Sequence, residues 1–136
     1  MTDGYSKRTL VDKLGIKPHT RIALVSAPRG YRTALGRLPT HVTVTTNAQG
    51  TPAWIQFFTR RRAELERKFP ALARALAPDG ALWISWPKKA SGVATDLTED
   101  AVRAVALAHG LVDVKVCAVD DVWSGLKLVR RVKDRG

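Results

Sequence analysis

The amino-acid sequence predicts an α/β fold: a mostly parallel sheet with helices on both faces and an antiparallel last strand. Short, nearly continuous apolar segments, such as residues 21–27 and 81–86, are typical of strands buried on both faces of a parallel sheet. Segments with helical spacing of apolar residues alternate with these strands. Near the end, two strand-like segments at residues 112–119 and 126–132 follow one another without a helix, which favours antiparallel pairing.

The first half of the chain is predicted to hold two helices and three strands. The helices have apolar residues along one face and cover residues 6–14 and 31–38. The strands are rich in apolar and β-branched residues and cover residues 21–27, 41–45 and 54–59. Gly15 is placed to end the first helix, and Pro28 with Gly30 marks the turn before the second.

The second half begins with a helix whose apolar residues are spaced four, three and four apart, at Leu65, Phe69, Leu72 and Leu76. Pro70 lies inside this helix and is expected to kink or divide it, because proline removes a backbone donor. After a polar loop at residues 87–96, Thr98 is the expected N-cap of a last helix that ends near Gly110.

Composition narrows the classes of function. The 136 residues, 45% of them hydrophobic, suffice for one domain over residues 1–136, with a short frayed N-terminus and a basic C-terminal tail. Cys117 lies in an apolar segment, where a buried, unreactive thiol is expected, and three histidines without ligand spacing predict no metal site.

The chain has neither a signal-like apolar start nor the roughly 20 apolar residues of a membrane span. A cytoplasmic protein without a membrane partner is expected, and its oligomeric state stays open.

The element order resembles a compact Rossmann-like, class I methyltransferase-like fold. Residues 76–85 are similar to the turn and strand that precede that family's fifth-strand loop, and residues 16–21 are similar to its entry to strand one. More closely, residues 4–132 resemble a family of small bacterial proteins known only as a domain of unknown function. The segments that carry this resemblance are residues 86–92, 96–97, 110–115 and 123–127. It implies a fold and no established activity.

Two features of cofactor-binding methyltransferases are missing from their expected places. The loop at residues 26–31 has a single glycine, and residues 45–47 are Thr, Thr and Asn where a carboxylate would bind ribose. Arg29 and Arg32 would also repel the sulfonium of S-adenosylmethionine. We therefore predict a non-catalytic binding domain with no cofactor and no catalytic residues. A divergent S-adenosylmethionine-dependent methyltransferase-like enzyme is the alternative.

The net charge is +11, and no acidic residue occurs between Lys13 and Ala63. Ligands of open parallel sheets bind beyond the carboxyl ends of the strands. The loops expected there carry a basic rim of seven cations: Arg29, Arg32, Arg60, Arg61, Arg62, Lys88 and Lys89. Such a rim suits phosphate, so nucleic acid or a phosphorylated small molecule is the predicted partner. The candidates for stacking on bases, each of which could instead pack in the core, are Tyr31, Trp86 and Trp123.

Other interpretations stay open for single features. The protein could be an adaptor that docks an acidic protein or pairs through an exposed sheet edge. Asp96 could be a base beside Lys88, although an Asp before Leu-Thr-Glu more often caps a helix. The cations expected at the opposite edge of the sheet, as a second basic patch, are Arg130, Arg131, Lys133 and Arg135.

Overall fold

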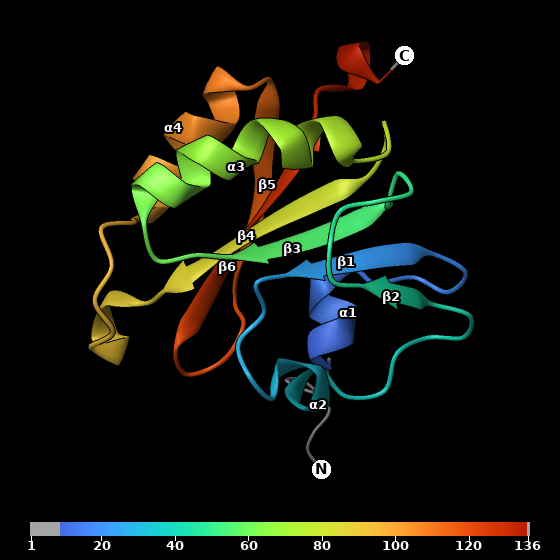
Figure 1. The fold of residues 1–136 in the computed structure, drawn as a ribbon, viewed down its shortest axis with the longest axis horizontal. Helices are drawn as coiled ribbons and strands as arrows, with labels where there is room; N and C mark the ends of the chain where they lie inside the picture. Colours follow the sequence, from blue (N-terminus) through green and yellow to red (C-terminus); the bar gives the residue numbers. More distant parts are fainter. Residues whose placement is uncertain (1–8, 136) are drawn as a thin grey trace.

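A computed structural model describes residues 9–135, which build a six-stranded sheet in the order β2-β1-β3-β4-β6-β5 (Figure 1). The strands are β1 (Arg21–Val25), β2 (Thr43–Thr45), β3 (Trp54–Phe58), β4 (Ala81–Pro87), β5 (Leu111–Ala118) and β6 (Trp123–Arg130). The strands β1 to β4 pair in parallel, and β6 runs antiparallel to both β4 and β5. The predicted mostly parallel sheet with an antiparallel last strand is confirmed.

Helices cover both faces of the sheet. The helices α3 (Arg62–Ala75) and α4 (Glu99–Ala108) lie on one face, and α1 (Leu10–Leu14) and α2 (Tyr31–Leu35) lie on the other (Figure 1). Two single-turn 3₁₀ helices, η1 (Lys89–Ser91) and η2 (Val132–Asp134), follow β4 and β6. The helices on both faces agree with the prediction.

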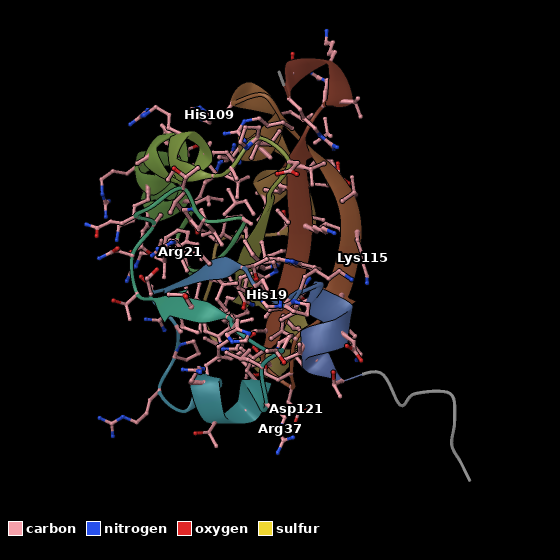
Figure 2. The ribbon with its side chains drawn as sticks, turned by 90° about the vertical axis from the view of Figure 1, so that its right-hand side faces the viewer. His19, Arg21, Arg37, His109, Lys115 and Asp121 are labelled. Carbon is pink, nitrogen blue, oxygen red and sulfur yellow. The ribbon has the colours of Figure 1, made fainter. Side chains whose placement is uncertain are left out.

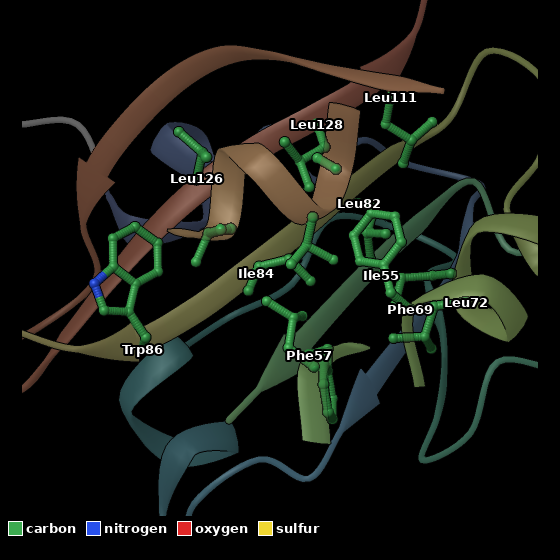
Figure 3. Packing of buried hydrophobic residues seen from close by; sticks show 14 of the residues in the cluster. Ile55, Phe57, Phe69, Leu72, Leu82, Ile84, Trp86, Leu111, Leu126 and Leu128 are labelled. Carbon is green, nitrogen blue, oxygen red and sulfur yellow. The ribbon is translucent and has the colours of Figure 1, made fainter. Parts of the chain in front are cut away.

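Strand β3 is buried throughout because it has a core on each side. Ile55 and Phe57 pack into the cluster under α3 and α4, whereas Trp54 and Phe58 pack into the cluster under α1 and α2. Figure 3 shows Phe57 and Ile84 in the first of these clusters. Burial on both faces removes the polar alternation that would mark a surface strand.

Several predicted elements differ in length from the observed ones. Helix α2 stops at Leu35 rather than near residue 38, because Gly36 takes a φ of +86° that leaves the helical region. Helix α3 runs through Pro70 as one element, so the predicted division is wrong. Its buried face, which includes Leu65 and Phe69, outweighs the hydrogen bond that proline cannot make. The predicted helical residues 6–8 and the predicted frayed N-terminus lie outside the described residues.

Helix α1 is held by side chains from the sheet beneath it. The carbonyl oxygen of Leu14 accepts hydrogen bonds from the indole Nε1 atoms of Trp54 (2.8 Å) and Trp83 (3.0 Å). All three residues are buried. Gly15 ends the helix with a φ of +72°, and Lys115 Nζ donates to the carbonyl of Lys13 at 3.0 Å. Two adjacent parallel strands therefore fasten a helix of only five residues.

The loop before α4 caps two helices. The predicted N-cap Thr98 is confirmed, because its Oγ1 accepts from the backbone N–H of Ala101 at 3.1 Å. Asp96 caps the other helix: its Oδ1 accepts from the backbone N–H of Arg62, the first residue of α3, at 2.7 Å. Thr95 Oγ1 donates to the carbonyl of Arg60 at 2.6 Å. These bonds tie the segment after β4 to the segment after β3.

The C-terminal cations divide into structural and exposed groups. The guanidinium of Arg130 donates to the carbonyls of Ala73 and Ala77, so it closes the C-terminal end of α3. Arg131 and Lys133 are exposed, and Arg135 Nε donates to the carbonyl of Arg130 at 3.0 Å. Arg130 is therefore a fold-stabilising residue rather than part of a second basic patch.

Within the described part of the chain, no helix has the length and apolar character needed to cross a membrane.

Replacing Trp83 with Phe tests the anchoring of α1. The variant loses one donor to the Leu14 carbonyl and leaves a small void, so the free energy of unfolding should fall by about 1–3 kcal/mol. Urea denaturation measures this change. Trp123→Phe is the matched control, since the indole N–H of the half-buried Trp123 donates no hydrogen bond to residues 9–135. Equal losses in the two variants would contradict the anchoring role.

Replacing Asp96 tests the long-range cap of α3. Asp96→Ala removes the acceptor for the Arg62 N–H and should lower the free energy of unfolding by about 1 kcal/mol. Asp96→Asn keeps a side-chain oxygen at the cap and should stay close to the unsubstituted protein in the same urea titration. If the Asn variant lost as much stability as the Ala variant, the carboxylate charge rather than the cap would be responsible.

Candidate functional site

The carboxyl edge of the sheet contains the topological switch point. Strand β2 lies on one side of β1, and β3 with β4 lies on the other, so the crossovers reverse direction between β1 and β3. Open α/β sheets bind their ligands in the crevice outside this point. Three hollows open along this edge.

The first hollow, here called the β1 hollow, has a volume of about 410 Å³. Its lining includes Leu24, Ser26, Gly30, Tyr31, Arg32, Val44 and Thr46. Ser26 has a φ of +58° and Gly30 a φ of +81°, so the loop after β1 is bent through the left-handed region twice. Apart from its chain neighbours, no atom of residues 9–135 lies within 4 Å of a Cβ built on Gly30, which leaves this backbone open to the hollow. A serine in the left-handed region at the end of a strand is a backbone feature that often accompanies a functional site. It is visible in the structure and not in the sequence.

A buried chain of polar side chains starts at the wall of the β1 hollow. The hydroxyl of Tyr31 donates to Gln56 Oε1 at 2.8 Å, and Gln56 Nε2 donates to Ser85 Oγ at 3.0 Å. Gln56 and Ser85 are fully buried. Burial raises the pKa of the Tyr31 phenol, and the hydrogen bond with Gln56 lowers it by less, so the hydroxyl remains a donor. Gln56 is not identified as a site residue from the sequence alone. A single amide inside an otherwise apolar strand is nevertheless a pattern that indicates a buried polar contact.

The second and third hollows are contiguous, because Ala94 and Thr95 line both. The β4 hollow has a volume of about 570 Å³ and is lined in part by Trp86, Lys88, Lys89, Leu97, Glu99 and Ser124. The arginine hollow has a volume of about 340 Å³ and is lined by Arg60, Arg61, Ala94, Thr95 and Asp96. Together they join the ends of β3 and β4 to the N-terminus of α4.

The structure brings most of the basic rim to these hollows, but not all of it. Arg32 lines the β1 hollow, and the cations of the other two are Arg60, Arg61, Lys88 and Lys89. Arg29 is exposed and lines none of the three hollows. The side chain of Arg62 is bound to Glu66, with 3.0 Å between Nε and Oε2, so it is an ion-pair residue of α3.

The three stacking candidates are more buried than expected. Tyr31 is 3% exposed and meets the Phe58 ring edge-on, with 4.7 Å between the ring centroids. Trp123 is half-buried and packs on the same Phe58 ring at 5.2 Å. Trp86 is 6% exposed, and it alone of the three lines the β4 hollow. The packing of Tyr31 leaves it no free ring face for a base, so a stacking role stays a prediction for Trp86 and Trp123.

Three of the carboxylates near the edge already have partners. Asp96 caps α3, which makes it a structural residue rather than a base beside Lys88. Asp120 Oδ1 accepts from the backbone N–H groups of Val122 and Trp123 at 2.8 Å each. Glu99 is ion-paired with Arg103. Asp96, Asp120 and Glu99 are therefore engaged in folding contacts, whereas Asp121 is exposed.

The three histidines lie away from this edge, whereas Cys117 lies near the carboxyl end of β5, opposite Gly125 of β6. His19 and His41 stack with their ring centroids 4.8 Å apart where β1 and β2 begin, and His109 follows α4. Figure 2 shows His19 near Arg21, the first residue of β1, with His109 well apart from both. Cys117 is half-buried rather than fully buried, and burial raises the pKa of its thiol. Among residues 9–135, no group of three or more His, Cys, Asp and Glu side chains could hold a metal ion.

The fold is similar to that of solved methyltransferases. The ribosomal protein L11 methylase of Lactobacillus delbrueckii subsp. bulgaricus matches with a TM-score of 0.62 at 14% identity, over 90% of this chain and 75% of that one. A SAM dependent methyltransferase from Aquifex aeolicus matches with a TM-score of 0.62 at 13% identity, over 88% and 86% of the chains. The 1,6-didemethyltoxoflavin-N1-methyltransferase of Burkholderia thailandensis, solved with bound S-adenosylhomocysteine, matches with a TM-score of 0.54 at 13% identity, over 95% and 80%.

No family model matches the sequence, and no curated protein matches it. The structural similarities confirm the Rossmann-like, class I methyltransferase-like fold. They also correct the prediction of a non-catalytic binding domain, because the solved proteins that share the fold are methyltransferases and favour the methyltransferase-like alternative.

Proposed function

We propose that the protein is a divergent S-adenosylmethionine-dependent methyltransferase-like enzyme whose cofactor site is the β1 hollow. The position of this hollow carries the proposal. It lies at the carboxyl ends of β1 and β2, beside the switch point, in a fold shared with methyltransferases. Its volume of about 410 Å³ is within the range of small-molecule sites.

The lining of the β1 hollow fits the adenosyl part of the cofactor. Leu24 and Val44 offer apolar contact for the base, and Gly30 leaves backbone open for close approach. Thr46 stands where related folds use a carboxylate, and its hydroxyl can hydrogen-bond a ribose hydroxyl. The neighbouring Thr45 is not available in this way, because its hydroxyl donates to the carbonyl of Asn47 at 2.7 Å.

The positive charge of Arg32 in the β1 hollow attracts the carboxylate of the cofactor and repels its sulfonium. Arg32 is placed to hold the carboxylate of the methionyl group, since a guanidinium binds carboxylates in a planar fork. The same cation repels the sulfonium at the centre of S-adenosylmethionine. When bound, the cofactor supplies an electrophilic methyl group. We therefore expect S-adenosylhomocysteine, which lacks the sulfonium charge, to bind more tightly than S-adenosylmethionine.

Isothermal titration calorimetry with both compounds tests the proposal. The unsubstituted protein should bind S-adenosylhomocysteine saturably. Arg32→Gln should weaken that binding by at least about tenfold, because a charge-assisted hydrogen bond contributes about 1.5–3 kcal/mol. Thr46→Val should weaken it by a smaller factor, through loss of one neutral hydrogen bond.

Arg37→Gln is the matched control, because Arg37 is exposed, lines none of the three hollows and carries the same charge. Its affinity for S-adenosylhomocysteine should equal that of the unsubstituted protein. The proposal fails if neither compound binds saturably, or if Arg32→Gln and Arg37→Gln bind equally well.

A further inference from the structure

We propose that the β4 hollow binds a small molecule in which a planar apolar ring system carries an anionic group such as phosphate. That this molecule is the methyl acceptor rests on the proposed function. The binding itself does not, because it follows from the side chains that line the hollow.

The floor and walls of the hollow are apolar. Trp86 is 6% exposed and Leu97 is 4% exposed, and both line the hollow together with Pro87 and Val93. A flat indole among aliphatic side chains favours a planar ligand, because ring faces stack in an offset arrangement. The volume of about 570 Å³ accommodates one such ligand.

The rim of the hollow is positively charged. Lys88 and Lys89 line it directly, and Arg60 with Arg61 lines the contiguous arginine hollow. None of these four cations forms an ion pair with an acidic side chain of residues 9–135. Unpaired like charges gathered around one depression raise the local positive potential, which an anionic group would lower.

The acidic side chains at the hollow do not neutralise this rim. Glu99 is bound to Arg103, which also contacts Asp100 and Asp113. Asp96 is directed to the backbone N–H of Arg62. The N-terminal turn of α4, a helix of ten residues, borders the hollow at Thr98 and adds positive partial charge. The carboxylates therefore serve the fold, while the lysines and arginines remain available to a ligand.

Hydrogen bonds hold the segment that forms the wall in place. The backbone N–H of Lys88 donates to the carbonyl of Val122 at 2.6 Å, and Ser91 Oγ donates to the carbonyl of Lys88 at 2.7 Å. The backbone N–H of Leu97 donates to Thr95 Oγ1 at 3.1 Å. A preformed wall loses little conformational entropy on binding, which favours a small ligand that contributes few contacts.

The test compares 1-naphthyl phosphate with 1-naphthol, which share the ring system and differ in the anionic group. Calorimetry on the full chain at near-physiological salt, without S-adenosylhomocysteine, should give at least about tenfold tighter binding for the phosphate. A double substitution, Lys88→Gln with Lys89→Gln, should reduce that preference to below about threefold and leave 1-naphthol binding unchanged.

Two further variants make the result specific to the hollow. Ala94→Phe places a ring at an exposed position that lines both contiguous hollows, and it should weaken binding of both compounds. The charge-matched control, Arg37→Gln with Lys133→Gln, removes two exposed cations elsewhere and should bind 1-naphthyl phosphate normally.

The inference is overturned if the two compounds bind equally, or if the control pair loses as much affinity as the lysine pair. It is also overturned if 1-naphthyl phosphate does not bind while a single-stranded oligonucleotide binds through Lys88 and Lys89. If 1-naphthyl phosphate does not bind but S-adenosylhomocysteine does, the anion site is contradicted and the proposed function is not. Binding here without any S-adenosylhomocysteine binding would contradict the proposed function and keep the anion site.

Discussion

A single carbonyl oxygen, that of Leu14, accepts hydrogen bonds from two buried indoles, and this contact holds α1 against one face of the sheet. Trp54 and Trp83 come from neighbouring strands, and each would otherwise bury an unsatisfied N–H at a cost of about 1–3 kcal/mol. Helix α1, with five residues, is too short to be stable by itself. The two indoles place the helix, and the helix covers the indoles.

The other face is organised by bonds between loops that are distant in the sequence. Asp96 and Thr95 bind the start of α3, and Arg130 binds its end, so both ends of this helix are closed by residues from later elements. Strands β3 and β4 are paired neighbours, and the contacts of Thr95 and Asp96 hold the segment after β4 against the segment after β3. Thr95 lines both the β4 hollow and the arginine hollow, and Asp96 lines the arginine hollow, so two residues that hold α3 in place also contribute to the candidate site.

The excess of positive charge has two separate uses in the structure. Arg62, Arg103 and Arg130 stabilise helices and strands through ion pairs or carbonyl contacts. Other cations have no acidic partner among residues 9–135, and at the carboxyl edge Arg32 lines one hollow and Lys88 and Lys89 line another. Under the proposed function, this distribution of charge would favour acidic groups on the ligands, including the carboxylate end of an adenosyl cofactor.

The sequence by itself determined the features that depend on local periodicity. Apolar segments marked the strands, Thr98 marked the start of α4, and two consecutive strands marked the antiparallel end of the sheet. Tertiary structure decided what depends on contacts between distant residues. Tyr31 reaches Gln56 across 25 positions, Asp96 reaches Arg62 across 34, and Trp83 reaches Leu14 across 69. Such contacts leave no local pattern, because each partner is compatible with many other roles. Only the packed sheet decided which cations serve the fold and which remain free for a ligand.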